Sequence, residues 1–128
     1  MFSRSKSSKS SASSMTKEFK ERVPLEERKQ QSKNILTKYP NSVPIYIDSS
    51  NMHKVIDKPK FVIPHGFTIG QLMISIRMRM KMNPATALFI FIDNLLVPVT
   101  TIVSSVYESH KDEDGFMYVS CSEENTFG

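Results

Sequence analysis

The side chains that most often carry catalysis or bind a metal are scarce in this sequence and widely spaced. The chain has one cysteine, Cys121, and three histidines, His53, His65 and His110. None of the histidines has partners at the spacing of a metal site or a catalytic triad. Cys121 alternates with valine and tyrosine in a strand-like pattern, so a structural thiol in a reducing compartment is the better interpretation. The sequence therefore predicts no catalytic residue, no metal ligand, no cofactor and no intrachain disulfide.

A different chemistry is possible at the closing segment SEENTFG, residues 122–128. The carboxylate of Gly128 has no side chain beside it, so it can enter a narrow enzyme cleft as a reaction site. The segment lacks apolar periodicity, and residues 123–128 are predicted to form a flexible tail. Glycine also supplies about 7% of residues in ordinary sequences, so chance is the other explanation. The tail by itself leaves both explanations open.

The first segment, residues 1–15, differs in composition from the rest of the chain. It begins MFSRSKSSKSSASS, which is rich in serine, contains basic residues and has no acidic residue. Such a segment buries too little apolar surface to offset the entropy of ordering, so we expect a disordered extension. It lacks the apolar region of a secretory signal, and no part of the chain has the run of about 18 apolar residues that a transmembrane helix requires.

The net charge of +4 is unevenly distributed along the chain. Residues 15–81 contain thirteen lysines and arginines and six acidic residues, whereas residues 82–128 contain one lysine and seven acidic residues. A basic half beside an acidic half indicates a surface that attracts acidic partners. It argues against general nucleic-acid binding, which favours one broad basic face.

Hydrophobic periodicity and turn residues predict the elements that must position any site. Thr16 is a possible N-cap of a first helix, and Pro24 suits the first turn of a second helix. Thr68 is a plausible cap of a third, although IRMRMKM also reads as an alternating strand. The expected helices are 16–23, 24–39, 68–82 and 100–110, and the expected strands are 43–48, 60–63, 87–93, 94–98 and 116–121.

This order of elements predicts an α+β fold, a ubiquitin-like β-grasp with two additional N-terminal helices. The domain spans residues 16–122, between the extension and the tail. The segment KFVI, residues 60–63, lies between Pro59 and Pro64. Proline cannot donate to a strand ladder, so this segment is predicted to be an edge strand. Its free backbone groups would accept an extended peptide by β-augmentation.

Five segments together resemble the autophagy ubiquitin-like modifier family, which includes the light-chain-three and GABA-receptor-associated proteins. They are FKERVPLEERK, KYPNSVPIYID, KFVIPHGFTIGQ, ALFIFID and HKDEDGFMYVSCSEENTFG. The resemblance implies a substrate of enzymes rather than an enzyme. Gly128 would be joined to phosphatidylethanolamine by activating and conjugating enzymes, and a cysteine protease would process or deconjugate it. The protein would then be cytoplasmic before conjugation and on autophagosomal membranes afterwards.

The same resemblance implies cargo receptors whose short peptides carry an aromatic residue, two spacers and an aliphatic residue. The pocket for the aromatic residue would map to Gln31, Ile35, Pro44, Tyr46, Lys60, Val62 and Phe116. The pocket for the aliphatic residue would map to Phe61, Ile63, Pro64, Phe67 and Leu72. The cations that meet acidic residues of the peptide would be Lys58, Lys60, Arg77 and Arg79. Relatives usually carry glutamate at the position of Gln31 and a smaller aliphatic residue at that of Tyr46, so the preferred peptides are expected to differ.

A further segment, ALFIFID, has two interpretations. As a buried strand it needs no function. In the family its exposed aromatic residues bear on membrane tethering and a second class of partners, and Phe89 and Phe91 would be those residues. Two rival functions also remain open at the level of sequence. The chain would be an unconjugated adaptor that only binds peptides, or a modifier attached to protein lysines.

Overall fold

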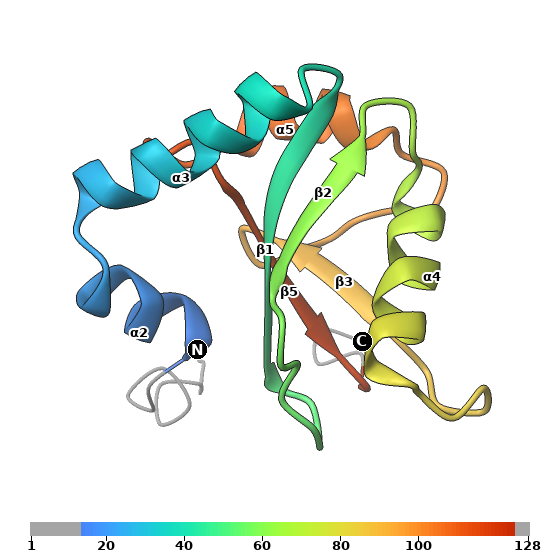
Figure 1. Cartoon of the computed structure of the whole chain (residues 1–128). Helices are drawn as coiled ribbons and strands as arrows, with labels where there is room; N and C mark the ends of the chain where they lie inside the picture. Colours follow the sequence, from blue (N-terminus) through green and yellow to red (C-terminus); the bar gives the residue numbers. More distant parts are fainter. Residues whose placement is uncertain (1–13, 125–128) are drawn as a thin grey trace.

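The computed structural model describes residues 14–124, which form one mixed five-stranded sheet with helices on both faces. Figure 1 shows α4 on one side of the sheet and α2 with α3 on the other. The elements are α2 (Met15–Arg22), α3 (Leu25–Lys38), β1 (Ser42–Asn51), β2 (Lys60–Pro64), α4 (Ile69–Met80), β3 (Phe89–Ile92), β4 (Leu95–Leu96), α5 (Val103–His110) and β5 (Met117–Ser122). The predicted α+β grasp with two additional N-terminal helices is confirmed.

The sheet has the strand order β2-β1-β5-β3-β4, so β2 lies at one edge and β4 at the other. The central pair β1 and β5 is parallel, and every other pair of neighbouring strands is antiparallel. The prediction that KFVI forms an edge strand is therefore confirmed. Each face of β1 packs against different helices because side chains alternate along a strand.

One face of the sheet packs on an aliphatic core. Val43, Ile45 and Ile47 of β1 join Leu72 and Ile76 of α4 in one buried cluster, and all five have no exposed surface. On the opposite face Tyr46 joins a smaller aromatic cluster with residues of α2. The hydrophobic spacing along 68–82 predicts the first of these contacts, and the helical interpretation of that segment is confirmed.

The ends of several helices differ in detail from the expectation. Helix α2 begins at Met15, and its N-cap is Ser14, whose hydroxyl accepts from the N–H of Lys17. The prediction that Thr16 is this cap is wrong, because the Thr16 hydroxyl instead donates to Asp48 Oδ2 at 2.7 Å. Thr68 does cap α4 and forms a full capping box with Gln71.

Within residues 14–124, no helix has both the length and the apolar character needed to span a membrane. The predicted extension lies almost wholly outside the described residues, and so do the last four residues of the predicted tail, including Gly128.

Candidate functional site

One open edge of the sheet is strand β2, whose single neighbouring strand within residues 14–124 is β1. Its side chains alternate between the two faces of the sheet, as in any strand. Phe61 and Ile63 are 2% and 4% exposed and point into the core, whereas Lys60 and Val62 point outward, with Val62 39% exposed. The strand therefore presents one polar and one apolar side chain next to backbone groups that have no neighbouring strand.

An aromatic cluster lies on the α2–α3 side of this edge. The rings of Phe19 and Tyr46 stack with centroids 4.6 Å apart and an interplanar angle of 15°. Phe116 meets Phe19 edge-on at 6.2 Å. Ile35 of α3 packs against the same cluster. Because Phe19 comes from α2, this helix supplies part of the site and is more than an addition to the grasp.

A cavity of about 340 Å³ opens between this cluster and the start of β2. Its lining residues are Phe19, Arg22, Tyr46, Asp57, Lys58, Pro59 and Lys60. Three of them, Tyr46, Lys58 and Lys60, were predicted to bind a peptide. The other four, Phe19, Arg22, Asp57 and Pro59, were not predicted to bind a peptide. For Phe19 the one available signal was its apolar side chain inside the otherwise polar segment KEFKER.

The remaining residues predicted for the aromatic pocket do not line the cavity; they are Gln31, Ile35, Pro44, Val62 and Phe116. The Lys60 ammonium donates to Gln31 Oε1 at 2.8 Å, so it joins β2 to α3. It also lies 4.9 Å from the centroid of the Phe19 ring. Pro44 pairs with Val62 in the β1–β2 register. Burial, and then the charge of Arg22, lower the pKa of Lys60.

The residues predicted for the aliphatic pocket are placed differently. Leu72 has no exposed surface, and it lies with Phe61 and Ile63 in the core between the sheet and α4. Phe67 is half-buried and Pro64 is exposed. In this conformation Pro64 and Phe67 present surface that a ligand can contact. The side chains of Phe61, Ile63 and Leu72 instead fill the core.

Cations gather beside the cavity and along the open edge. Arg79 of α4 donates to the carbonyl oxygens of Lys58 and Lys60, at 3.0 and 2.8 Å. Its guanidinium carbon lies 3.7 Å from the centroid of the Phe61 ring. Arg77 lies in the same last turn of α4. This arrangement agrees with the sequence-based expectation of a surface that attracts acidic ligands.

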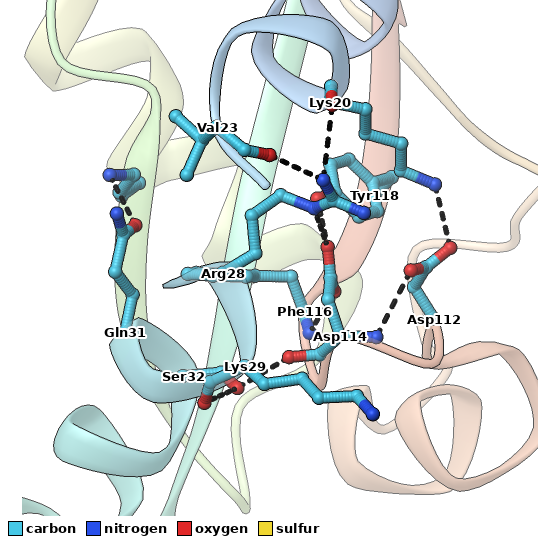
Figure 2. A network of polar contacts seen from close by, with 11 residues as sticks. Lys20, Val23, Arg28, Lys29, Gln31, Ser32, Asp112, Asp114, Phe116 and Tyr118 are labelled. Carbon is cyan, nitrogen blue, oxygen red and sulfur yellow. Dashed lines mark hydrogen bonds and ion pairs between the residues drawn. The ribbon is translucent and has the colours of Figure 1, made fainter. Parts of the chain in front are cut away.

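A buried polar network holds α2 and α3 against β5 and so fixes the wall of the site (Figure 2). Arg28 Nε donates to Asp114 Oδ2 at 2.9 Å, and its Nη1 donates to the carbonyl of Val23. Tyr118 Oη donates to the same carboxylate oxygen of Asp114. Burial alone would lower the pKa of Arg28, but the hydrogen bond to Asp114, together with the charges of Tyr118, Asp114 and Asp112, outweighs burial and raises that pKa. Burial, and then Asp114, raise the pKa of Tyr118.

The turn before β5 also fits closely against α3. Ser32 donates to the carbonyl of Asp114, and Gly115 follows with a φ of +93°. A Cβ at Gly115 would lie 2.3 Å from Ser32 Oγ, so only glycine fits there. Because α3 approaches this turn so closely, the polar network around Asp114 and the aromatic cluster lie on the same side of the sheet.

The second predicted surface, on ALFIFID, is less exposed than expected. Phe91 is only 5% exposed, and Phe89 is half-buried. The expectation that Phe91 is an exposed aromatic is therefore wrong. The exposed apolar side chains of this region are Leu95 and Leu96 in β4.

The thiol of Cys121 does not line the cavity. Cys121 has no exposed surface, and burial, followed by the charge of Asp48, raises the pKa of its thiol to about 12. A structural thiol is the interpretation that this environment favours. Across residues 14–124, no three side chains of His, Cys, Asp or Glu gather as metal ligands.

Comparison with known proteins gives a consistent result. A family model described as autophagy protein Atg8, ubiquitin like, matches residues 27–128. Autophagy-related protein 8d of Arabidopsis thaliana is 44% identical over 112 residues, which cover 86% of this chain and 93% of that protein. Autophagy-related protein 8 of Emericella nidulans is 42% identical over 116 residues, covering 89% of this chain and 98% of the relative. The crystal structure of Trypanosoma brucei ATG8 superposes with a TM-score of 0.78 at 27% identity, covering 81% of this chain and 91% of that one.

Proposed function

Because this chain belongs to the Atg8 family of ubiquitin-like autophagy proteins, we propose that it is a modifier whose Gly128 is conjugated to phosphatidylethanolamine during autophagosome formation. The match to the family model extends through Gly128, which supports that residue as the conjugated one. Activating and conjugating enzymes of the pathway supply the reactive cysteines, and a cysteine protease deconjugates the product. The modifier itself then needs no catalytic residue.

The same proposal includes recruitment of cargo receptors through aromatic-x-x-aliphatic peptides. One observation carries it: an open strand edge at β2 lies beside a cavity with the aromatic side chains of Phe19 and Tyr46 and a lysine at its entrance. Backbone pairing with β2 would give affinity, and the cavity would select the aromatic side chain. Conjugation then brings these receptors to autophagosomal membranes, and the unconjugated protein is cytoplasmic.

Conjugation is tested with Gly128→Ala in cells of the source organism under starvation. We expect the natural sequence to give a membrane-pelleting form that phospholipase D releases, and the variant to give none, because a methyl group obstructs the enzyme clefts. Gly66→Ala is the matched control, since a Cβ there would meet no atom within 4 Å. A ladder of heavier species resistant to phospholipase D would show attachment to protein lysines. If all three proteins stay soluble, the unconjugated adaptor is favoured.

Peptide recruitment is tested by calorimetry with Lys60→Glu and an acidic aromatic-x-x-aliphatic peptide. Reversing the charge at the cavity entrance opposes the acidic residues, so we expect a loss of affinity of at least about tenfold. Lys33→Glu is the control, because Lys33 is exposed on α3 and does not line the cavity. Equal affinities for the natural chain and Lys60→Glu would count against this part of the proposal.

A further inference from the structure

The open edge of β2 is partly occupied by a side chain of the protein itself. Arg79 Nη1 donates to the carbonyl oxygens of both Lys58 and Lys60, and the guanidinium lies on the face of the Phe61 ring. The planar guanidinium can donate in its plane while it stacks, which an ammonium group cannot do. We refer to these three contacts together as the Arg79 clamp.

The register of the sheet shows which edge groups the clamp covers. The N–H of Ile47 donates to the carbonyl of Pro59, and the N–H of His65 donates to the carbonyl of Asn41. In an antiparallel pair, hydrogen-bonded residues alternate with residues whose backbone groups point away. The odd-numbered residues of β2 therefore face β1, and the backbone groups of Lys60 and Val62 face outward. The carbonyl that Arg79 binds at Lys60 is thus an acceptor that an added strand would use.

Few other backbone groups along the β2 edge remain free to pair with a ligand. The carbonyl of Pro64 accepts from the N–H of Phe67 in the following turn. Within residues 14–124, the outward-facing groups without a protein partner are the N–H groups of Lys60 and Val62 and the carbonyl of Val62. The clamp thus closes the end of the edge that lies beside the aromatic cavity, because Lys58 and Lys60 also line that cavity.

We propose that Arg79 is an internal competitor for the β2 edge, and that it selects extended peptides with a carboxylate beside the residue that pairs with Lys60. A strand that pairs fully with Lys60 displaces the guanidinium from its two carbonyl oxygens. An Asp or Glu of the peptide then supplies a new acceptor for the released guanidinium. A neutral peptide offers no such replacement and binds more weakly. This inference rests on the peptide binding proposed above, in which Arg79 already meets acidic residues of the peptide, and adds that its guanidinium must first leave the strand edge.

The clamp also explains how the free protein protects its edge strand from pairing with other chains. An uncovered edge strand is a template for pairing with other chains, and natural proteins cover or charge such edges. Here one cation covers the acceptor at Lys60, and the release of that cation is coupled to an acidic partner. The aliphatic core behind Phe61 does not change in this step, so the competition stays local to the strand edge.

The test measures the affinity of Arg79→Met for two peptides, one acidic and one with its acidic residues replaced by alanine. We expect the variant to bind the neutral peptide about three- to tenfold more tightly than the natural chain does, because no charge-assisted bond has to be broken. The preference for the acidic peptide should fall. Arg77→Met is the matched control for lost charge and should not tighten neutral binding. If Arg79→Met binds the neutral peptide with the same affinity as the natural chain, or more weakly, the proposal is overturned.

A second variant separates the clamp from stability and from overall charge. Arg79→Lys keeps the positive charge but loses the paired donors and the stacking, so it should also bind the neutral peptide more tightly while retaining most of the acidic preference. Thermal unfolding of both variants confirms that the chain is folded under the conditions of the assay. Neutral-peptide affinity in Arg79→Lys equal to that of the natural chain would contradict the competition.

A measurement without peptide distinguishes failure of this inference from failure of the proposed function. In the free protein the side-chain N–H signals of Arg79 should exchange with water more slowly than those of Arg77, as seen by nitrogen-15 NMR. Equally fast exchange would show that no clamp exists. Slow exchange in a protein that binds neither peptide would instead remove the peptide-binding function, and with it the proposed selectivity.

Discussion

The two faces of the sheet are built in different ways. The face toward α4 carries a continuous aliphatic cluster, with residues such as Ile45, Leu72 and Ile76 fully buried. The face toward α2 and α3 has a small aromatic cluster around Phe19 and depends on buried polar groups: Arg28, Ser32, Asp48 and Asp114. The first face is held by non-directional apolar contacts and the second by contacts with defined geometry.

This difference determines where a side chain of a ligand can enter the protein. Between β2 and α4 the aliphatic face is closely packed, because the side chains of Phe61, Ile63 and Leu72 fill the space there. On the other face, polar contacts fix α2 and α3 at a distance from β2 and leave the cavity between Phe19 and Lys60. Three substitutions test whether the two faces differ in this way.

The largest effect is expected at the buried ion pair of the polar face. Arg28→Met removes the partner of Asp114, whose side chain has no exposed surface. An unpaired buried carboxylate is costly, so the free energy of unfolding should fall by about 3 kcal/mol. Urea denaturation followed by circular dichroism measures this change.

Lys20→Met is the control for that variant, because the Lys20–Asp112 pair joins the same helix pair to the same turn but is partly exposed. Its loss should cost no more than about 1 kcal/mol. Equal effects of the two substitutions would show that the polar face does not depend on its buried charge.

A smaller effect is expected at Asp48, which joins α2 to the end of β1. Burial alone would raise the pKa of Asp48, but the hydrogen bonds from Ser50 and Thr16 outweigh it and lower that pKa. Asp48→Asn loses charge-assisted bonds and should lower the free energy of unfolding by about 1–2 kcal/mol at pH 7.

The pH dependence gives the sign of this contribution. A carboxyl group with a lowered folded-state pKa contributes stability above its unfolded pKa of about 3.9, and this contribution is lost as the pH falls through the folded-state value. The difference between the natural chain and Asp48→Asn should therefore be constant from pH 5 to 7 and shrink below about pH 4. A difference that grows on acidification would contradict the assignment.

The smallest effect is expected on the aliphatic face. Ile76→Val removes one buried methylene from α4 without disturbing a polar contact. The free energy of unfolding should fall by about 1 kcal/mol, and the binding of peptides should not change. A loss of unfolding free energy as large as that of Arg28→Met would show that the aliphatic face depends on precise contacts as much as the polar face does.

Much of the candidate site followed from local sequence patterns and from resemblance. The prolines around KFVI predicted the edge strand, as found, whereas the outward direction of Lys60 and Val62 came from the structure. Tyr46, Lys58 and Lys60 were predicted and line the cavity. Phe19 was missed because a single apolar residue in a polar helix does not reveal what it contacts. Phe91 was misplaced because the exposure of a strand side chain depends on what packs over that face of the sheet, which the local pattern does not show.

Local spacing and residues such as proline were enough to predict the order of the elements, the edge position of β2 and the lack of periodicity in the tail. The stacking of Phe19 on Tyr46, the pairing of Arg28 with Asp114 and the bond from Arg79 to the carbonyl of Lys60 became visible only in the folded chain. Each of these contacts joins residues from separate elements. Their geometry depends on how the helices pack across the sheet, which no local pattern records.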